Sequence, residues 1–486
     1  MRKGMEPEQL MITMTAAAWI GIMFLIAVAL RAKVKFLGRM LVPACMIAGI
    51  IGFILMNTTG LGDATSEEYS TIAGMLYNVL FINLGLTLGE KKAGDKKKKK
   101  VPFRERKSNS MFSGIVGMGS FWAIAYSLQA LIGFAVLYLI GGFWNMDAGY
   151  GLLIPFGFAQ GPGQAVTYGT VIEGEGMTDA VQVAMLFAAL GFIIAFAIGV
   201  PFARKGIEKG MVCSKVRMGD ELVSGFIQPK KQENYGKVTT YGGNLDVMTL
   251  HLALIGLCWI LGLQIGKLWA FIPGYFGNLF SQLLFFNGML AAYAVKYIMG
   301  RLGFQKYMDR GTQVRISNSC TDFMVTATFM AISLKVVGKW IAPVVIACIV
   351  VAAVTWTLIR YFGARFGGEN DFERVLGEWG TVTGTNATGL SLVRIADPDN
   401  HTTTAAELGP ANIVNVPASY VVAPAICAFA AGNMKTGVMV MSLLGVVAAY
   451  LLFMRVTGVW GKKTFDMKTG EKYTVAADSV QPATEI

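Results

Sequence analysis

Two stretches rich in Gly, Thr, Gln and Pro interrupt this otherwise apolar chain. The first is FAQGPGQAVTYG, residues 158–169, and the second is GEWGTVTGTNATGLSLVRI, residues 377–395. A helix broken inside a membrane exposes N–H groups at one half-helix end, which suit an anion, and C=O groups at the other, which suit Na⁺. The two stretches therefore predict a site for a small anion and a cation.

The candidate ligands lie within these stretches. Gly161, Pro162 and Gly163 would let a hairpin tip turn and let a ligand approach the backbone. The remaining candidates are their polar or flexible neighbours: Gln160, Gln164, Thr167, Thr383, Gly384, Thr385, Asn386 and Thr388. Among them, Na⁺ is expected at Thr167, Thr385 and Asn386. The alternative is that the glycines pack helices and the stretches are ordinary turns.

Charged residues in or near apolar segments are further candidates. Asp322, in SNSCTDFMVTATFMA, could ligate Na⁺, carry a proton or bind a substrate ammonium, or it could pair with Arg315 at a helix end. Arg394 could hold a substrate carboxylate through two hydrogen bonds, or it could mark the cytoplasmic end of a helix. Glu378 is expected to line a cytoplasmic vestibule, and His251 to be structural.

Long apolar runs must position these residues. Of 486 residues, 54% are hydrophobic and 15% charged, whereas about 25% is usual for soluble domains. Runs such as WIGIMFLIAVAL are long enough, with their flanks, to cross roughly 30 Å of hydrocarbon. The alternating ten-residue segments of a barrel are missing from the sequence. We therefore predict an all-α polytopic membrane protein.

The apolar runs predict ten or eleven transmembrane helices. They lie near residues 12–30, 39–57, 70–89, 111–140, 179–201, 248–266, 279–300, 316–335, 340–361, 412–430 and 436–454. The last two could instead be one broken helix, or a re-entrant piece followed by a span. In this interpretation the amides Asn83, Gln282 and Asn287 form hydrogen bonds between helices.

The charges between the predicted spans set the orientation. Residues 31–39, 91–107, 202–247 and 301–315 are basic, and residues 57–70 carry only acids. Basic loops face the cytoplasm, so the N-terminus is expected outside. The net charge of +12 has the same explanation. The lysine run in 91–107 is interpreted as an orientation signal or a lipid-headgroup contact, not as a nucleic-acid site.

Five spans in each half would give the halves opposite orientations, which is the geometry of an inverted repeat. We expect an N-terminal repeat at 1–201 with a re-entrant loop near 149–170, and a cytoplasmic linker at 202–247. A C-terminal repeat follows at 248–430 with a re-entrant loop near 377–395. Residues 431–486 would add an extra span and a cytoplasmic tail. Paired interruptions of this kind point to a transport site.

Other function classes find little support. The six cysteines form no CxxC pair and there are only two histidines, so neither a thiolate metal site nor a cofactor is expected. The sequence has no HExxH, GxSxG or phosphate-loop motif, so no enzyme is expected. A channel stays open as an alternative, although channels usually repeat their loops around a central pore.

The two Gly-rich stretches and several apolar segments of the chain resemble the bacterial sodium/glutamate symporter family. FAQGPGQAVTYGTVIEGEGMTDAVQVAMLFAALGFIIAFAIGVPFAR is similar to the family's first signature region, which has a Gly-Gly-His-Gly-Thr core and ends in Gly-x-Pro-x-Ala-Arg. GTVTGTNATGLSLVRI is similar to its second signature, a Gly-Ala-Thr-x-Thr-Ala core. FINLGLTL, NGMLAAYAV and FMAISLKVVGKW resemble other parts of the family, so the similarity extends from about residue 40 to about residue 430.

The resemblance implies a ten-span inverted-repeat transporter that couples Na⁺ influx to uptake of a dicarboxylic amino acid. It also implies a homodimer in the bacterial cytoplasmic (inner) membrane. Two departures affect specificity: residues 161–164 read Gly-Pro-Gly-Gln where the family has Gly-His-Gly-Thr, and Asn386 stands where Pro is usual. Glutamate is the expected substrate, and another organic anion, such as a 2-hydroxycarboxylate, stays open. The scarcity of carboxylates within the spans favours Na⁺ coupling, whereas Asp322 keeps H⁺ coupling open.

Overall fold

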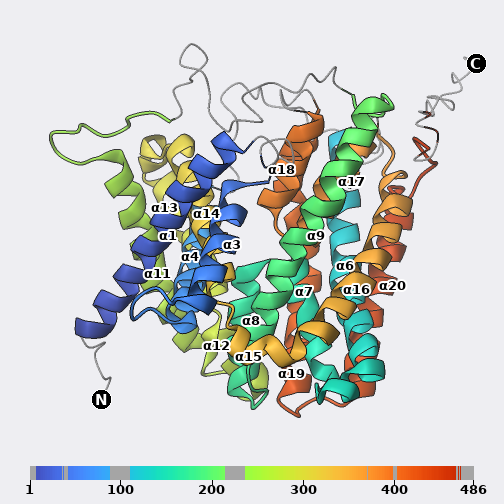
Figure 1. Ribbon diagram of the computed structural model, residues 1–486. Helices are drawn as coiled ribbons and strands as arrows, with labels where there is room; N and C mark the ends of the chain where they lie inside the picture. Colours follow the sequence, from blue (N-terminus) through green and yellow to red (C-terminus); the bar gives the residue numbers. More distant parts are fainter. Residues whose placement is uncertain are drawn as a thin grey trace, which may run out of the picture.

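The computed structural model describes residues 7–34, 37, 42–87, 110–213, 236–368, 370–397, 402–466, 469 and 471, and these residues are almost entirely helical (Figure 1). The lysine-rich run at 91–107, residues 214–235 of the linker and most of the tail after 466 lie outside them. The first half contains α1 (Pro7–Lys33), α3 (Ala44–Thr58), α4 (Ser66–Thr87), α6 (Ser110–Ile140), α7 (Ile154–Phe158), α8 (Pro162–Gly174) and α9 (Ala180–Glu208).

The second half begins at α11. Its helices are α11 (Val247–Trp269), α12 (Tyr275–Gln282), α13 (Leu284–Arg301), α14 (Arg310–Met330), α15 (Leu334–Val337), α16 (Ile341–Gly363), α17 (Asp371–Val382), α18 (Asn386–Ala396), α19 (Thr404–Ala430) and α20 (Thr436–Thr457). Short 3₁₀ helices are η1 (Gly141–Trp144), η2 (Ala148–Leu153), η4 (Phe304–Tyr307) and η5 (Gly338–Trp340). No β-strand occurs in the described residues, which confirms the predicted all-α class.

Eight described helices are long and apolar enough to cross a membrane, and α12 with α13 adds a ninth if this pair, bent by 71°, is one span. The predicted spans at 39–57 and 316–335 fall on α3 and α14, and neither helix meets these criteria. The α3 helix has only 15 residues. The α14 helix is too polar, and part of its polarity is satisfied by other helices: Asn83 of α4 donates to Gln313 O and to Ser317 Oγ of α14.

The last two predicted spans are two separate helices. Both α19 and α20 are long and apolar enough to cross a membrane, and residues 431–435 join them. Residues 402–466 therefore contain neither a single broken helix nor a re-entrant piece. Three prolines lie inside α19, at Pro410, Pro417 and Pro424, and the helix continues through all of them.

The helices form two groups that lie side by side (Figure 1). In the first group α4 packs on α13 and α14, α3 packs on α14, and α1 and α11 cover the outside. In the second, α6 packs on α16, α19 and α20, while α9 packs on α17 and α18. The α4–α13 contact joins the third predicted span of the first half to the second predicted span of the second half, and the α14–α3 contact joins the third of the second half to the second of the first. A twofold relation between the halves would require such a pair of contacts. The inverted repeat itself stays a prediction.

The two ends of the helix bundle differ in charge. Arg31, Lys205, Arg301 and Arg455 lie in the last turns of α1, α9, α13 and α20, and we name this end the basic side. At the opposite end, the acidic side, α4 begins with Glu67 and Glu68, and the turns near α7–α9 carry Asp147, Glu173 and Asp179. In Figure 1 the basic side is at the top and the N-terminus at the bottom. The positive-inside rule makes the basic side the expected cytoplasmic face.

Candidate functional site

The first interruption forms a helical hairpin that rises from the acidic side. α7 ends at Phe158, and α8 starts at Pro162, the favoured first position of a helix. Between them, Gly161 has φ +81° and ψ −175°, a conformation that side-chain-bearing residues rarely adopt. Trp122 of α6 donates its Nε1–H to Ala159 O at 2.7 Å and so holds the turn. The chain therefore reverses at residues 159–161.

The second interruption forms a hairpin that descends from the basic side. α17 ends at Val382, and α18 begins after Thr385, whose hydroxyl accepts from Thr388 N at 3.3 Å as an N-cap. Trp379 of α17 donates to Ala195 O of α9 at 3.1 Å. Thr383 donates to Trp379 O at 2.6 Å and closes the last turn of α17. The two hairpins thus enter from opposite sides.

The two tips meet inside the protein. A Cβ built on Gly161 would lie 2.5 Å from Thr385 Cγ2 and 3.0 Å from Gly384 O. The N-termini of α8 and α18 therefore lie at the same place, next to the C-termini of α7 and α17. The first N–H groups of a helix have no partner within it, and neither do the last C=O groups. Both kinds of group are concentrated at this junction.

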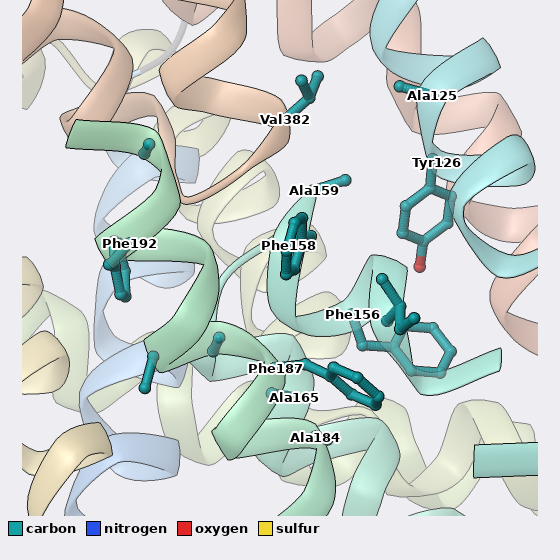
Figure 2. Close-up of a cluster of buried hydrophobic side chains, with 14 of the residues drawn as sticks. Ala125, Tyr126, Phe156, Phe158, Ala159, Ala165, Ala184, Phe187, Phe192 and Val382 are labelled. Atoms are coloured by element: carbon teal, nitrogen blue, oxygen red, sulfur yellow. The ribbon is translucent and has the colours of Figure 1, made fainter. Parts of the chain in front are cut away.

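Apolar rings surround the tips (Figure 2). Phe156 and Phe158 of α7 are fully buried, as is Phe187 of α9. Figure 2 places Phe158 between Phe192 of α9 and Tyr126 of α6. These side chains bury the backbone of the first tip, whereas the second tip is partly exposed at Thr385 and Asn386. An unpaired polar group here costs a few kcal/mol, so the free backbone groups of the junction favour a bound ligand.

Polar side chains from α6 and α19 support the tips. Tyr126 OH donates to Gln164 Oε1 at 3.1 Å, and Gln129 Nε2 donates to Val382 O at 2.8 Å. Gln160 Nε2 donates to Ser419 Oγ at 3.1 Å, and Asn415 Nδ2 reaches the same oxygen at 3.3 Å. None of these four supporting residues was predicted from the sequence. A polar residue within an apolar run, such as Gln129, was the one available signal.

Individual candidates differ in accessibility. Thr385 and Asn386 are partly exposed, and Asn386 Oδ1 accepts from Thr381 Oγ1 at 3.4 Å. Pro162, Gln164 and Thr383 are buried. Thr167 donates to Gly163 O at 2.8 Å within α8, one turn from the tip. Other buried candidates serve close packing: a Cβ on Gly163 would collide with the Tyr77 ring, and one on Gly384 would lie 2.9 Å from Thr388 Oγ1.

The charged candidates lie away from the junction. Asp322 is exposed on α14, within hydrogen-bonding reach of the Cys45 thiol of α3, and so belongs to the first helix group. Arg394 is exposed in the last turn of α18, about 12 Å along the helix axis from Asn386. Their role in binding stays a prediction. The amides were predicted to bond between helices. Asn83 of α4 does bond to α14, whereas Gln282 bonds within α12.

The expectation for Glu378 is wrong. Its side chain is 0% exposed, and neither carboxyl oxygen has a hydrogen-bond partner among the described residues. The cause is the environment of α17, in which every residue is buried. The charged residues of this segment suggested a helix face in contact with water. In the structure, α17 is surrounded by α6, α9, α16, α18 and α19. Glu378 therefore lies in the protein interior and not at a vestibule.

A buried ion cluster fixes the base of the second hairpin. Arg374 of α17 is fully buried and donates to both oxygens of Glu407 of α19 at 2.8 Å, and to Asp371 Oδ1 at 2.9 Å. Asp371 Oδ2 also accepts from Thr464 Oγ1 at 2.9 Å. Two parallel hydrogen bonds from a guanidinium fix geometry as well as charge. The cluster holds the base of α17 to α19 and to the segment after α20.

Comparison with known proteins gives one family. The family model described as "Sodium/glutamate symporter" matches residues 9–370. The match confirms the resemblance drawn from the sequence. It includes the first hairpin and ends before α17, so the second signature region lies beyond the matched range. No curated protein matches the chain.

Proposed function

Because the chain belongs to the sodium/glutamate symporter family, we propose that it transports glutamate or a related small carboxylate together with Na⁺, by alternating access. The observation that carries the proposal is the contact between the two hairpin tips at Gly161 and Thr385. Two helix N-termini and two helix C-termini converge at this contact. Such a junction can hold an anion and a cation together.

The anion is assigned to the N-termini of α8 and α18. The first intrahelical bonds there are Ala165 N to Gly161 O and Gly389 N to Thr385 O. The N–H groups of Gly163 and Gln164 precede the first of these bonds, and those of Asn386 and Ala387 precede the second. A substrate carboxylate would accept from these groups and gain from both helix dipoles.

The cation is assigned to the oxygens beside the same tips. Thr385 and Asn386 are the accessible side chains at the second tip, and the C-termini of α7 and α17 supply carbonyl oxygens. Neutral oxygens of this kind suit Na⁺ and need no titratable group. Thr167 stays a candidate one turn away. Asp322 stays a separate candidate for a second cation or for a proton.

The packing between the two helix groups supports access from the basic side. On the acidic half of α9, Gln182 accepts from Ser333 N at 3.0 Å, Met185 Sδ accepts from Ser70 Oγ at 3.6 Å, and Phe192 stacks on Phe329. Beyond Phe192, toward the basic side, Ile193 and Ala197 are exposed. We infer a state that is closed on the acidic side and open toward the basic side.

Glutamate is the proposed substrate, although the first tip differs from the family signature. Where the family has Gly-His-Gly-Thr, this chain has Gly-Pro-Gly-Gln at 161–164. The side-chain oxygen of Gln164 accepts from Tyr126. Substrate recognition at this tip then rests on the backbone, which recognises a carboxylate without distinguishing one from another. A bacterial inner-membrane location and a homodimer complete the proposal.

The test is uptake of radiolabelled glutamate into proteoliposomes, with and without an inward Na⁺ gradient. We expect uptake only with the gradient. Uptake driven by a pH gradient and not by Na⁺ would refute the coupling ion. If Na⁺ drives uptake of a 2-hydroxycarboxylate and not of glutamate, the substrate assignment is wrong and the site assignment stands. Single-channel currents at fixed voltage would contradict alternating access.

A further inference from the structure

An apolar groove runs along the outer surface of the first helix group, between α11 and α13. Its volume is about 530 Å³. Leu250, Leu254, Leu257 and Leu261 line it from α11, and Val295 and Met299 line it from α13. Residues of η4 and Thr240 close its end at the basic side. We name this feature the α11–α13 groove.

The groove follows from the way in which the two helices cross. A Cβ built on Gly262 would lie 2.7 Å from the Cα of Gly288, so the helix backbones touch at this level. Gly262 directly follows Leu261, the groove residue nearest the acidic side. From this contact toward the basic side, larger side chains separate the helices and leave a slot between them. The slot is therefore closed at its deep end and open to the lipid side.

The length of the groove matches one leaflet of a membrane. Leu250 and Leu261 are eleven residues apart on α11, which is about 16 Å along a helix. The hydrocarbon core of a bilayer is about 30 Å thick, so one leaflet contributes about half of this. The groove starts at the basic side, where α11 begins. Its dimensions suit one acyl chain of the leaflet on that side.

The rim of the groove is basic. Lys237 and Lys306 are exposed at this end, on the segments that close the groove, and Lys306 Nζ lies over the ring of the lining residue Tyr307. Arg301 is exposed nearby, but its guanidinium donates to Tyr297 Oη, outside the groove lining. Thr239 Oγ1 donates to Tyr307 O at 2.6 Å and ties Lys237 to the same rim. Two acids lie nearby, against three cations: Asp309 is buried and accepts from Thr312 N at 2.7 Å, and Asp246 accepts from Met248 N at 2.8 Å. The rim therefore offers cations to a phosphate headgroup.

We infer that the α11–α13 groove binds one acyl chain of an anionic phospholipid, whose headgroup lies at Lys237 and Lys306. The apolar lining accounts for the chain, and the exposed cations account for the preference in charge. Anionic lipids concentrate in the cytoplasmic leaflet, which the basic side is expected to face. The site is independent of the transport site, because all its residues lie in the first helix group or in the segments that join its helices.

The test is native mass spectrometry of the full chain in detergent, with added phosphatidylglycerol or phosphatidylcholine. We expect one phosphatidylglycerol retained per protomer, and weaker retention of phosphatidylcholine. Leu257→Trp fills the groove and should abolish this retention. Leu263→Trp is the matched control, because Leu263 is 47% exposed on the same helix and does not line the groove. Equal retention by the two variants would overturn the proposal.

A second set of variants tests the headgroup. Lys237→Gln and Lys306→Gln should each weaken phosphatidylglycerol binding about fivefold and leave phosphatidylcholine unchanged. Lys267→Gln, at the acidic-side end of α11, is the control and should have no effect. An unchanged lipid preference in both rim variants would refute the assigned headgroup position. Disulfide-linked dimers formed by Leu257→Cys in membranes, and not by wild type, would show that a second copy occupies the groove and would overturn the proposal.

Discussion

Gly161 and Thr385 face each other at the junction of the two hairpins, so closely that a Cβ on Gly161 would lie 2.5 Å from Thr385 Cγ2. Each residue is the N-cap of a helix, Gly161 of α8 and Thr385 of α18, and its backbone conformation therefore sets the direction of that helix N-terminus. Neither tip has room to move toward the other. The geometry of the proposed site depends on both residues together.

Gly161→Ala should abolish uptake while the protein remains folded. The methyl group would collide with Thr385, and φ +81° is strained for alanine. The control is Gly174→Ala in the same helix, where a Cβ would meet no atom within 4 Å. Both variants are assayed for Na⁺-driven uptake, and size-exclusion profiles establish folding. Normal uptake by Gly161→Ala would remove the tip contact from the site.

Asn386→Ala should raise the Na⁺ concentration needed for half-maximal uptake about tenfold. A tenfold change corresponds to about 1.4 kcal/mol, which is the contribution of one contact as strong as a hydrogen bond. Ser391→Ala is the matched control, because Ser391 lies farther along α18 and donates within the helix to Ala387 O. The measurement is initial uptake rate against Na⁺ concentration. If both variants shift the Na⁺ dependence equally, Asn386 is not a sodium ligand.

Accessibility tests the proposed open side. Ala387 is exposed at the second tip, so Ala387→Cys should react with a membrane-impermeant maleimide applied from the basic side. Both variants are made in a Cys213→Ser background, because Cys213 is an exposed native thiol near the basic-side end of α9. In that background Leu279→Cys, buried in α12, should stay unlabelled and serves as the control. The readout is the mass of the labelled protein in membranes of known orientation. Labelling of Ala387→Cys from the acidic side alone would reverse the inferred direction of opening.

Arg374→Met should destabilise the fold by about 3–5 kcal/mol, because Glu407 and Asp371 would remain buried without their cation. Arg455→Met, an exposed arginine in the last turn of α20, should change stability little. Thermal unfolding in detergent compares the two variants with wild type. A melting temperature for Arg374→Met that equals that of Arg455→Met would show that the cluster contributes no stability.

Acid should loosen the start of α14 through Asp309. Partial burial raises the pKa of this carboxyl, but hydrogen bonds from Thr312 N and Thr312 Oγ1 outweigh it and lower the pKa below the ordinary value. A lowered pKa in the folded state stabilises the fold above the ordinary pKa of about 3.9, and this stabilisation is lost as pH falls through the lowered pKa. Melting curves between pH 6 and pH 3 should show a steeper loss for wild type than for Asp309→Asn. Parallel losses would contradict this assignment.

Much of the architecture could be predicted because its signals are local. Apolar runs mark the spans, and Gly161 and Gly384 mark the breaks in the hairpins. Two predicted spans, at 39–57 and 316–335, fall on helices without the length or apolarity of a span: α3 has 15 residues, and α14 is polar, with Ser317 bonded to Asn83 of α4. Such tertiary partners leave no trace in the local sequence.

The candidate site was predicted in part for the same reason. The tips could be identified from glycine and threonine, whereas their supports, Gln129 and Ser419, lie on long helices whose register is set by packing. For Glu378, by contrast, a role was predicted that the structure contradicts. Its charge suggested a wet surface, but α17 is enclosed on all sides, and the charges of Arg374 and Glu407 compensate each other in the interior.

The convergence of two helix N-termini and two helix C-termini on one point has a thermodynamic consequence. An anion and a cation held within a few ångströms of each other, in a site largely enclosed by protein, would attract each other more strongly than in bulk water. Each then raises the affinity for the other by the same factor. In the proposed site, one bound ion alone would leave its charge uncompensated, and the second ion would compensate it. Obligatory co-transport would thus be a property of the electrostatics of one small volume, without a separate gate to enforce it.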